Sequence, residues 1–408
     1  MFQKTFIYIF IFLLSSFTFS QIENNLLTEL LNKNKTELDS VTDSPSKYKL
    51  QIIYTQINRD EDNNPFFTSY KFNVDKNKYF YPASTVKFPA ALLALEKLNP
   101  LSFIINRDTK YYIDSKYYNN VDSLGNVTKN YFSIAEDVKR IFLVSDNDAF
   151  NHLYEFLGQK ELNEGLWIKR YSDAKLIHRL SFSFNNQQNR STFRLKFEKD
   201  DQELFSSPDQ INPVQYKNYL KDLYQGKGYY SSGELINEPM DFTYRNYLSL
   251  EVLQEMLIAF LFPDHVPVEM TFDINKDDRE FTLKCMSMFP VESEMKEYQD
   301  TVHYPNNYVK FFYTKEMKKK NIRIFNKVGG AYGYLIDNAY IVDFDNGVEF
   351  LLSAVICVNE DGIFNDDKYE YDSIGLPFLE KLGKVIYNFE LEREREYKPD
   401  LSEFIFEY

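Results

Sequence analysis

Apolar residues recur at every third or fourth position in several segments of the chain, a spacing typical of amphipathic helices. The segments in which we expect helices are 25–38, 84–98, 134–144, 149–157, 249–261 and 372–392. In other segments apolar and polar residues alternate, as in strands that bury one face. The segments in which we expect strands are 47–56, 66–74, 308–313, 322–325, 338–344 and 348–358, with a tight Asp-Asn-Gly turn joining the last two into a hairpin. The expected strands therefore lie toward the two ends of the chain, and most of the expected helices lie between these two groups of strands.

The hydrophobic pattern weakens between residues 181 and 245. This stretch contains a Ser/Asn/Gln-rich patch at 185–191, a charged run at 198–203 and a Gly/Tyr/Ser-rich segment at 226–233. Irregular connections of this length are usually either functional or insertions.

Segment 79–98 changes from an aromatic, strand-like run into an Ala/Leu-rich helix that begins near Ser84. Ser84 and Lys87 are three positions apart, so on a helix their side chains lie on one face. A serine with an amine within reach is the simplest activated nucleophile, and the first helical turn offers free backbone N–H groups to an oxyanion. The same Ser-x-x-Lys spacing at 44–47, 172–175 and 293–296 lies in polar, turn-like sequence. The context, rather than the spacing, therefore marks Ser84 as a candidate nucleophile.

Two further polar clusters lie at the ends of regular segments. Ser145–Asn147 separates two expected helices, and by itself it is typical of a helix cap. The glycine-rich segment Asn326–Tyr334 follows the expected strand 322–325 and contains Lys327-Val-Gly329.

Taken together, Ser84-Thr-Val-Lys87, Ser145-Asp-Asn147 and Lys327-Val-Gly329 resemble the active-site signature of the class A β-lactamases and penicillin-binding proteins, which is Ser-x-x-Lys, Ser-Asp-Asn and Lys-Thr-Gly. The order along the chain agrees. The resemblance covers most of the chain after residue 20 except about 190–240, which looks inserted. It implies an α+β fold of three layers (α/β/α), in which residues 21–83 and 305–408 build one antiparallel sheet flanked by helices. Residues 84–304 would form an inserted all-helical domain.

The resemblance also implies the catalytic residues. Ser84 would be the nucleophile that becomes acylated, and Lys87 would accept or relay its proton. Ser145 would pass a proton to the leaving nitrogen.

The implied binding residues come from all three motifs. Asn147 would bind the substrate amide and orient Lys87. Lys327 would attract a substrate carboxylate, and Gly329 of the same motif would also belong to the substrate-binding residues. The backbone N–H groups of Ser84 and Gly330 would form the oxyanion hole, where the loss of one donor raises the barrier by about 3 kcal/mol.

Two departures from the family pattern bear on the reaction. Val328 stands where a hydroxyl residue is expected between Lys327 and the glycine. Segment 177–180 resembles the beginning of the family's Ω-shaped loop, but residues 181–188 contain no carboxylate to activate water, and Glu161 comes too early. The sequence therefore supports formation of an acyl-enzyme better than its hydrolysis.

Three functions remain open at this point. The first is a secreted class A β-lactamase-like serine hydrolase that opens a β-lactam amide through an acyl-enzyme at Ser84. The second is a penicillin-binding cell-wall peptidase, a D-alanyl-D-alanine carboxypeptidase, which would use the same acylation chemistry. The third is a non-catalytic relative that only binds.

Composition and charge limit the location and the kinds of partner that we expect for the protein. Residues 1–20 carry Lys4, an apolar run and small residues suited to cleavage, so we expect a signal peptide and a secreted or periplasmic protein without a stable membrane anchor. The net charge of −14 argues against nucleic acid as a partner. We expect a monomer that acts on a small β-lactam or a cell-wall peptide.

Histidine and cysteine, two of the usual ligands of zinc, are few in the sequence. The four histidines are scattered without the spacing of a zinc site, and we expect neither a metal nor a cofactor. Cys285 and Cys357 could form a disulfide or be two buried apolar residues, and the sequence leaves both possibilities open.

Overall fold

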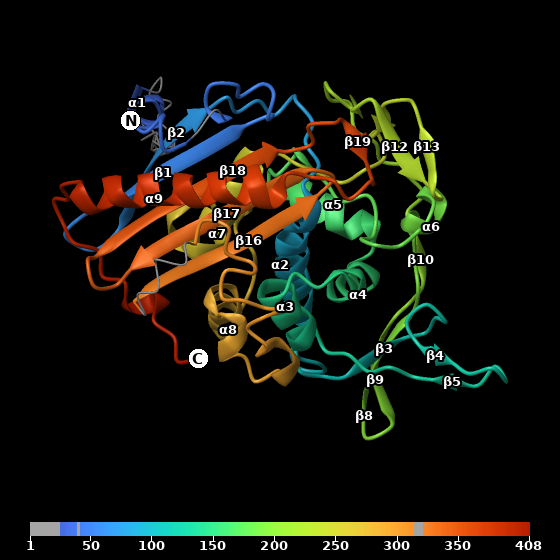
Figure 1. The fold of residues 1–408 in the computed structure, drawn as a ribbon. Helices are drawn as coiled ribbons and strands as arrows, with labels where there is room; N and C mark the ends of the chain where they lie inside the picture. Colours follow the sequence, from blue (N-terminus) through green and yellow to red (C-terminus); the bar gives the residue numbers. More distant parts are fainter. Residues whose placement is uncertain (1–24, 39–40, 314–320) are drawn as a thin grey trace, which may run out of the picture.

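A five-stranded antiparallel sheet in the order β16-β17-β18-β1-β2 organises the computed structural model, which describes residues 25–38, 41–313 and 321–408 (Figure 1). The strands are β1 (Gln51–Arg59), β2 (Pro65–Phe72), β16 (Ile322–Ala331), β17 (Tyr334–Asp343) and β18 (Val348–Cys357). Because β1 pairs antiparallel with β18, both ends of the chain build one sheet, which confirms the expected topology. The hairpin expected at 338–358 is confirmed as β17–β18.

Helices cover both faces of this sheet, so the expected three-layer arrangement is confirmed. Helices α1 (Asn25–Lys33) and α9 (Leu376–Glu392) pack against one face in a core that includes Ile52. Helix α7 (Leu250–Leu261) lies on the other face, in a core that includes Ile53 (Figure 1). The two isoleucines are neighbours on β1, and successive side chains of a strand point to opposite faces.

Helix α2 (Lys87–Leu98) runs through the middle of the molecule (Figure 1). Nearly all of its residues are buried, as expected for a helix that is apolar on all sides. Three helices pack against it: α3 (Ile134–Leu143), α4 (Asn147–Leu157) and α5 (Gln159–Ile168). Helix α8 (Lys276–Ser287) packs against α3, and the short helix α6 (Asn186–Arg190) packs against α5. The candidate nucleophile is thus attached to a helix that is almost entirely buried.

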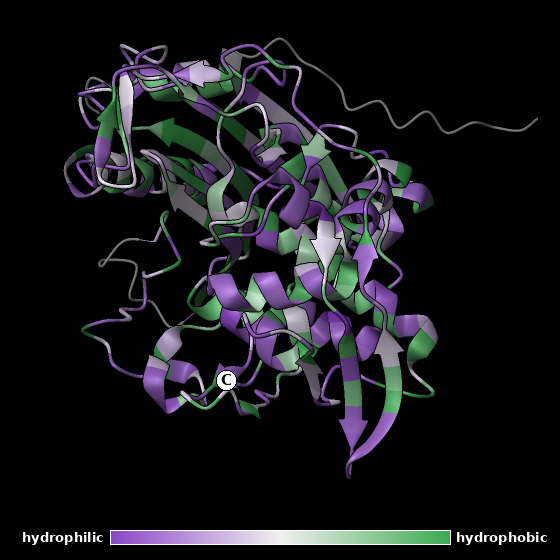
Figure 2. Cartoon of the chain, turned by 90° about the vertical axis from the view of Figure 1, so that its right-hand side faces the viewer, coloured by the Kyte–Doolittle hydropathy of each residue, from purple (hydrophilic) through white to green (hydrophobic). Residues whose placement is uncertain are grey.

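The inserted part is not all-helical, and this detail of the expectation is wrong. A three-stranded sheet is formed by β3 (Tyr111–Ile113), β8 (Leu195–Lys199) and β9 (Gln202–Ser207), and the β8–β9 hairpin projects from the lower end of the molecule (Figure 1, Figure 2). Further short strands are β4 (Asn120–Val121), β5 (Val127–Thr128), β6 (Ala174–Lys175), β7 (Ser191–Thr192), β10 (Gln210–Ile211), β11 (Tyr224–Gln225), β12 (Gly228–Ser231), β13 (Glu234–Ile236), β14 (Met240–Asp241), β15 (Tyr247–Leu248) and β19 (Ile363–Phe364). Strands this short carry too few residues for an alternating pattern to show in the sequence.

Several element boundaries also differ from the expectation. Segment 308–313 is a series of turns rather than a strand, and its backbone N–H groups at Phe311 and Phe312 donate to Asp337. The strand expected at 322–325 continues to Ala331, so the third motif lies within β16. Helices α5 and α8 have no counterpart in the expectation, and α8 is rich in charged residues that obscure its apolar positions.

Cys285 and Cys357 are both free and buried, so the alternative of two unpaired cysteines is confirmed. Within the described ranges no helix is long and apolar enough to cross a membrane. The expected signal peptide at 1–20 lies outside the described residues.

Candidate active site

The turn that carries Ser84 is a short 3-10 helix, Ala83–Val86, which leads directly into α2. Ala83 has a φ of 48°, a left-handed conformation that is unfavourable for a residue with a side chain. The turn is held by the Thr85 backbone N–H and hydroxyl, which donate to Pro82 O at 3.1 Å and 2.7 Å. Ser84 is therefore presented by a fixed turn rather than by the regular helix.

Lys87 is fully buried, and four oxygen atoms from three residues surround its amine. Nζ lies 2.9 Å from Ser84 Oγ, 2.6 Å from Asn147 Oδ1 and 3.3 Å from Ser145 Oγ, and it also donates to the Ser145 carbonyl. Burial lowers the pKa of Lys87 to about 7, although the charges of Asp146 and Asp148 oppose the shift. Near neutral pH a substantial fraction of this amine is uncharged and able to accept a proton.

Ser145 and Asn147 lie at the junction between α3 and α4. Asp146 caps α4 by accepting from the Ala149 backbone N–H at 3.0 Å, so the cluster does form a helix cap. Ser145 has a φ of 57°, and both its carbonyl and its hydroxyl contact Lys87. Such backbone strain costs about 1–3 kcal/mol and is typical of functional sites.

Lys327 approaches the same hydroxyl from β16. Its Nζ lies 2.8 Å from Ser145 Oγ, and the side chain is buried. Burial, together with the charge of Lys87, holds the pKa of Lys327 well below its usual range. Ser145 Oγ thus lies between two amines that cannot both be charged at low cost.

The two glycines of β16 lie beside the Ser84 turn. A Cβ atom at Gly329 would lie 2.7 Å from Pro82 O and 3.1 Å from Ser84 N, so only glycine allows the strand to approach this closely. Gly330 lines the same cavity as Ser84. The structure therefore brings together every site residue expected from the sequence: Ser84, Lys87, Ser145, Asn147, Lys327, Gly329 and Gly330.

Val328 lies on the other face of the sheet. It is paired directly with Asp337 on β17, whereas Lys327 is paired with Asn338, and paired residues share a face. Asn338 donates to the Leu253 carbonyl of α7, which places Lys327 on the α7 side. The buried valine side chain therefore points away from the amine of Lys327.

Ser181 is a residue of the site that sequence reasoning missed. Asn147 Nδ2 donates to its hydroxyl at 2.8 Å, and it lines the same cavity as Ser84. Ser181 also has a left-handed backbone, with a φ of 57°. The sequence offered one indication of its role, which is its position directly after segment 177–180. There, however, the sequence showed only that a carboxylate is missing.

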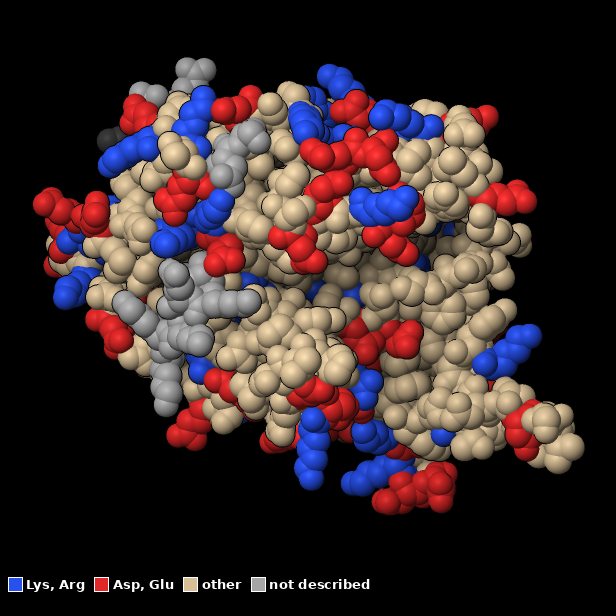
Figure 3. Space-filling view, viewed as in Figure 1, with Lys and Arg blue, Asp and Glu red and all other residues tan. Residues whose placement is uncertain are grey.

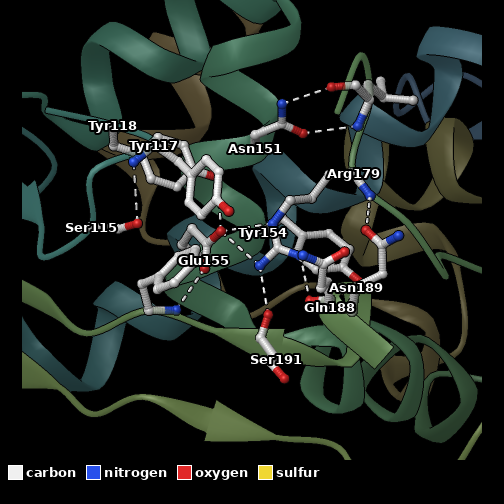
Figure 4. A network of polar contacts seen from close by, with 12 residues as sticks. Ser115, Tyr117, Tyr118, Asn151, Tyr154, Glu155, Arg179, Gln188, Asn189 and Ser191 are labelled. Carbon is white, nitrogen blue, oxygen red and sulfur yellow. Dashed lines mark hydrogen bonds and ion pairs between the residues drawn. The ribbon is translucent and has the colours of Figure 1, made fainter. Parts of the chain in front are cut away.

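The loop that carries Ser181 is anchored to α4 by a fully buried ion pair. Figure 4 shows Arg179 reaching Glu155, with Arg179 Nε 2.7 Å from Glu155 Oε1. Arg179 also donates to the carbonyls of Gln188 and Ser191 farther along the loop. Asn151 of α4 exchanges two hydrogen bonds with the backbone of Leu180, at 2.8 Å and 2.9 Å. These contacts fix the backbone on which Ser181 is held.

A cleft of about 390 Å³ opens beside Ser84, and Asn147, Ser181 and Gly330 also line it. In the described part of the chain, no three His, Cys, Asp or Glu side chains gather as metal ligands would. The arrangement places two serine hydroxyls around one buried amine, which are the groups that a serine acyl-transfer reaction needs.

Fold and site together define the class of a serine hydrolase built on an antiparallel sheet with an inserted helical part. A family model described as the Beta-lactamase enzyme family matches residues 35–270, more than half of the chain, and the chain belongs to this family. The match includes the Ser84 and Ser145 motifs and ends before Lys327. The protein is accordingly a β-lactamase-like serine hydrolase.

Several solved structures align with the fold of this chain. A beta-lactamase from Chitinophaga pinensis DSM 2588 aligns with a TM-score of 0.50 at 11% identity, covering 90% of this chain and 99% of that chain. The chromosome-encoded beta-lactamase of Vibrio parahaemolyticus aligns with a TM-score of 0.49 at 13% identity, over 89% and 100% of the two chains. PBP-A aligns with a TM-score of 0.48 at 14% identity, over 89% and 96%. The comparison with curated proteins gave no match.

Proposed function

We propose that the protein opens the amide of a β-lactam by forming an acyl-enzyme at Ser84, in the manner of class A enzymes, and that it hydrolyses this intermediate slowly. The observation that carries the proposal is the buried amine of Lys87, 2.9 Å from Ser84 Oγ and with a pKa lowered to about 7. An uncharged amine at this distance supplies the base that a serine hydroxyl needs.

Acylation follows from these contacts. Lys87 Nζ accepts the proton of Ser84 Oγ while it keeps its hydrogen bonds to Asn147 and the Ser145 carbonyl. Oγ bonds to the carbonyl carbon, and the oxyanion is stabilised by the backbone N–H groups of Ser84 and Gly330. Ser145 Oγ then gives its proton to the leaving nitrogen as the C–N bond breaks, and the ammonium of Lys87 restores that proton.

Hydrolysis of the ester lacks a comparable base. Among the residues that the structure describes, no carboxylate forms a hydrogen bond or ion pair with the side chain of Ser84, Lys87 or Asn147, and Asn147 donates instead to the hydroxyl of Ser181. Lys87 is then the remaining base for the attacking water. This arrangement supports slow release of the acyl group.

The proposed setting is extracellular or periplasmic, reached through the signal peptide expected at residues 1–20. We propose a monomeric enzyme that acts on a small-molecule substrate, and the net charge of −14 disfavours nucleic acid as a partner.

A penicillin-binding D-alanyl-D-alanine carboxypeptidase is the second candidate function, and Ser181 is the observation that favours it. A hydroxyl in place of a water-activating carboxylate suits an enzyme whose β-lactam ester persists. Fast release of D-alanine from a stem peptide, with negligible β-lactam turnover, would favour this function. The non-catalytic alternative is disfavoured by the direct contact between Lys87 and Ser84.

Intact-mass spectrometry after incubation with benzylpenicillin tests the proposal. We expect an adduct of one benzylpenicillin on the wild type and none on Ser84→Ala. Ser172→Ala is the matched control, because Ser172 is an exposed serine with the same Ser-x-x-Lys spacing outside the site. If the antibiotic disappeared without forming an adduct, and this loss required Ser84, hydrolysis of the acyl-enzyme would be fast rather than slow. Neither adduct nor loss would overturn the β-lactam assignment.

A further inference from the structure

The cleft beside Ser84 has an aromatic wall with one carboxylate. Tyr81, Tyr332, Tyr369 and Tyr371 all line it, and so does Asp367. Tyrosine faces attract cations, and a carboxylate within the same cleft adds to that attraction.

The tyrosines of this wall are held in place by hydrogen bonds and ring contacts. Tyr371 OH accepts from the Gly333 backbone N–H at 2.9 Å, and Tyr369 OH accepts from the Asn365 N–H at 2.8 Å. Tyr81 and Tyr332 pack edge to face with their ring centres 4.9 Å apart. Burial raises the pKa of Tyr369 to about 12, so its phenol is neutral at physiological pH.

The segment that carries Asp367 is braced by the region that looks inserted in the sequence. Strand β12 pairs in parallel with β19, with Gly228 opposite Ile363. Asn365 Nδ2 donates to the Tyr230 carbonyl of β12 at 3.0 Å. This region therefore supports one wall of the cleft.

The wall lies on the acyl side of the bond to be broken. Ser145, which gives its proton to the leaving nitrogen in the proposed mechanism, does not line the cleft, and neither does Lys327, whereas Ser181 and Gly330 do. A substituent in this cleft therefore belongs to the part of the substrate that stays bound to Ser84.

Charge around the cleft favours a cation. Asp367 is exposed and makes no ion pair with any described residue, so its carboxylate is available to a ligand. Figure 3 shows acidic atoms, with some basic ones, gathered over the segment that carries β19 above a hollow across this face. The two lysines of the site, Lys87 and Lys327, are buried and have lowered pKa values, so they oppose a cation only weakly.

We propose that Asp367 and the tyrosine wall select β-lactams whose acyl side chain carries an ammonium group. This inference rests on the proposed acylation of Ser84. The ammonium group contacts the Asp367 carboxylate at the rim while the rest of the side chain packs on the tyrosine rings.

The test compares three penicillins that differ in one group on the acyl side chain. Benzylpenicillin has no charge there, ampicillin has an amine and carbenicillin has a carboxylate. The measured quantity is the second-order rate of Ser84 acylation by the mature protein at about pH 7, where an α-amino group is mainly protonated. We expect ampicillin to react roughly three to ten times faster than benzylpenicillin, and carbenicillin to be the slowest.

Asp367→Asn should bring the ampicillin rate down to that of benzylpenicillin and raise the carbenicillin rate. Asp366→Asn is the matched control, because it removes the same charge from a neighbouring residue that does not line the cleft and instead accepts from the Lys368 backbone N–H. Added salt should shrink the difference between the three penicillins.

The outcomes separate this inference from the function on which it rests. Adducts with all three penicillins at equal rates, or an equal effect of Asp366→Asn and Asp367→Asn, would overturn the selectivity and leave the acylation intact. If none of the three labels Ser84, the proposed function fails, and the selectivity fails with it.

Discussion

Lys87 and Lys310 are both fully buried, and burial lowers the pKa of each. Lys87 begins α2, whereas Lys310 lies in the turns that precede β16. By charge and burial alone the two amines are hard to tell apart.

Their partners differ in chemistry. Lys310 Nζ donates to Asn326 Oδ1 at 2.6 Å and to the Met286 carbonyl, and neither of these acceptors has a proton to give. Asp337 lies close by and is itself held by the Asn326 side chain at 2.7 Å. Lys87, in contrast, contacts two hydroxyl groups, and one of them belongs to a residue that lines a cleft.

The difference shows that a lowered pKa does not by itself identify a catalytic base. Structural networks also perturb pKa values, and a base needs in addition a proton donor within reach and access for the substrate. Only Lys87 of this pair meets those conditions. The comparison yields three predictions.

The largest effect is expected from removing each amine in turn. Lys87→Met should slow acylation by benzylpenicillin roughly a thousandfold, because the base is lost. Lys310→Met should leave the acylation rate per folded molecule unchanged, but lower the free energy of unfolding by roughly 3 kcal/mol, because buried acceptors lose their donor. Labelling kinetics and denaturant unfolding measure the two quantities. Equal losses of acylation in both variants would remove the distinction between the two lysines.

A second, smaller effect on the acylation rate is expected from moving β16 away from the turn that carries Ser84. Gly329→Ala should slow acylation about a hundredfold, because its Cβ would clash with Pro82 O and displace the strand that carries the Gly330 N–H. Gly165→Ala is the matched control, since Gly165 lies in α5 and does not line the cleft, and its Cβ meets only the end of the Leu93 side chain, at 3.3 Å. If both variants reacted at the same rate, close approach of the strand would not limit the reaction.

The parts of this site that the sequence could predict are those in which a motif lies at a junction between elements. Ser84, Ser145 and Lys327 each follow or precede a strongly patterned segment, so both the fold and their convergence could be inferred. Ser181 could not be assigned, because its role depends on a contact with Asn147, more than thirty positions earlier. A lone serine such as Ser181 in place of a carboxylate forms no sequence motif by which its role could be recognised.

The packing of turns and short strands also could not be predicted from the sequence. Segment 308–313 has the alternation of a strand, but its N–H groups are taken by Asp337, a partner that only the folded sheet supplies. The pairing of β12 with β19 joins residues far apart in the chain over two residue pairs, too few to leave a pattern.

The smallest effect is expected in the pH dependence of acylation, which identifies the lysine that titrates. Acylation needs the uncharged form of Lys87, so its rate should rise with pH through about 7 and fall about tenfold for each unit below that value. Asp148→Asn should move the midpoint to lower pH, because the Asp148 carboxylate raises the pKa of Lys87. Asp209→Asn removes an equal charge that does not act on Lys87 and should leave the midpoint in place. If the midpoint moved with Lys310→Met but not with Asp148→Asn, the titrating base would be Lys310, and the assignment of Lys87 would be wrong.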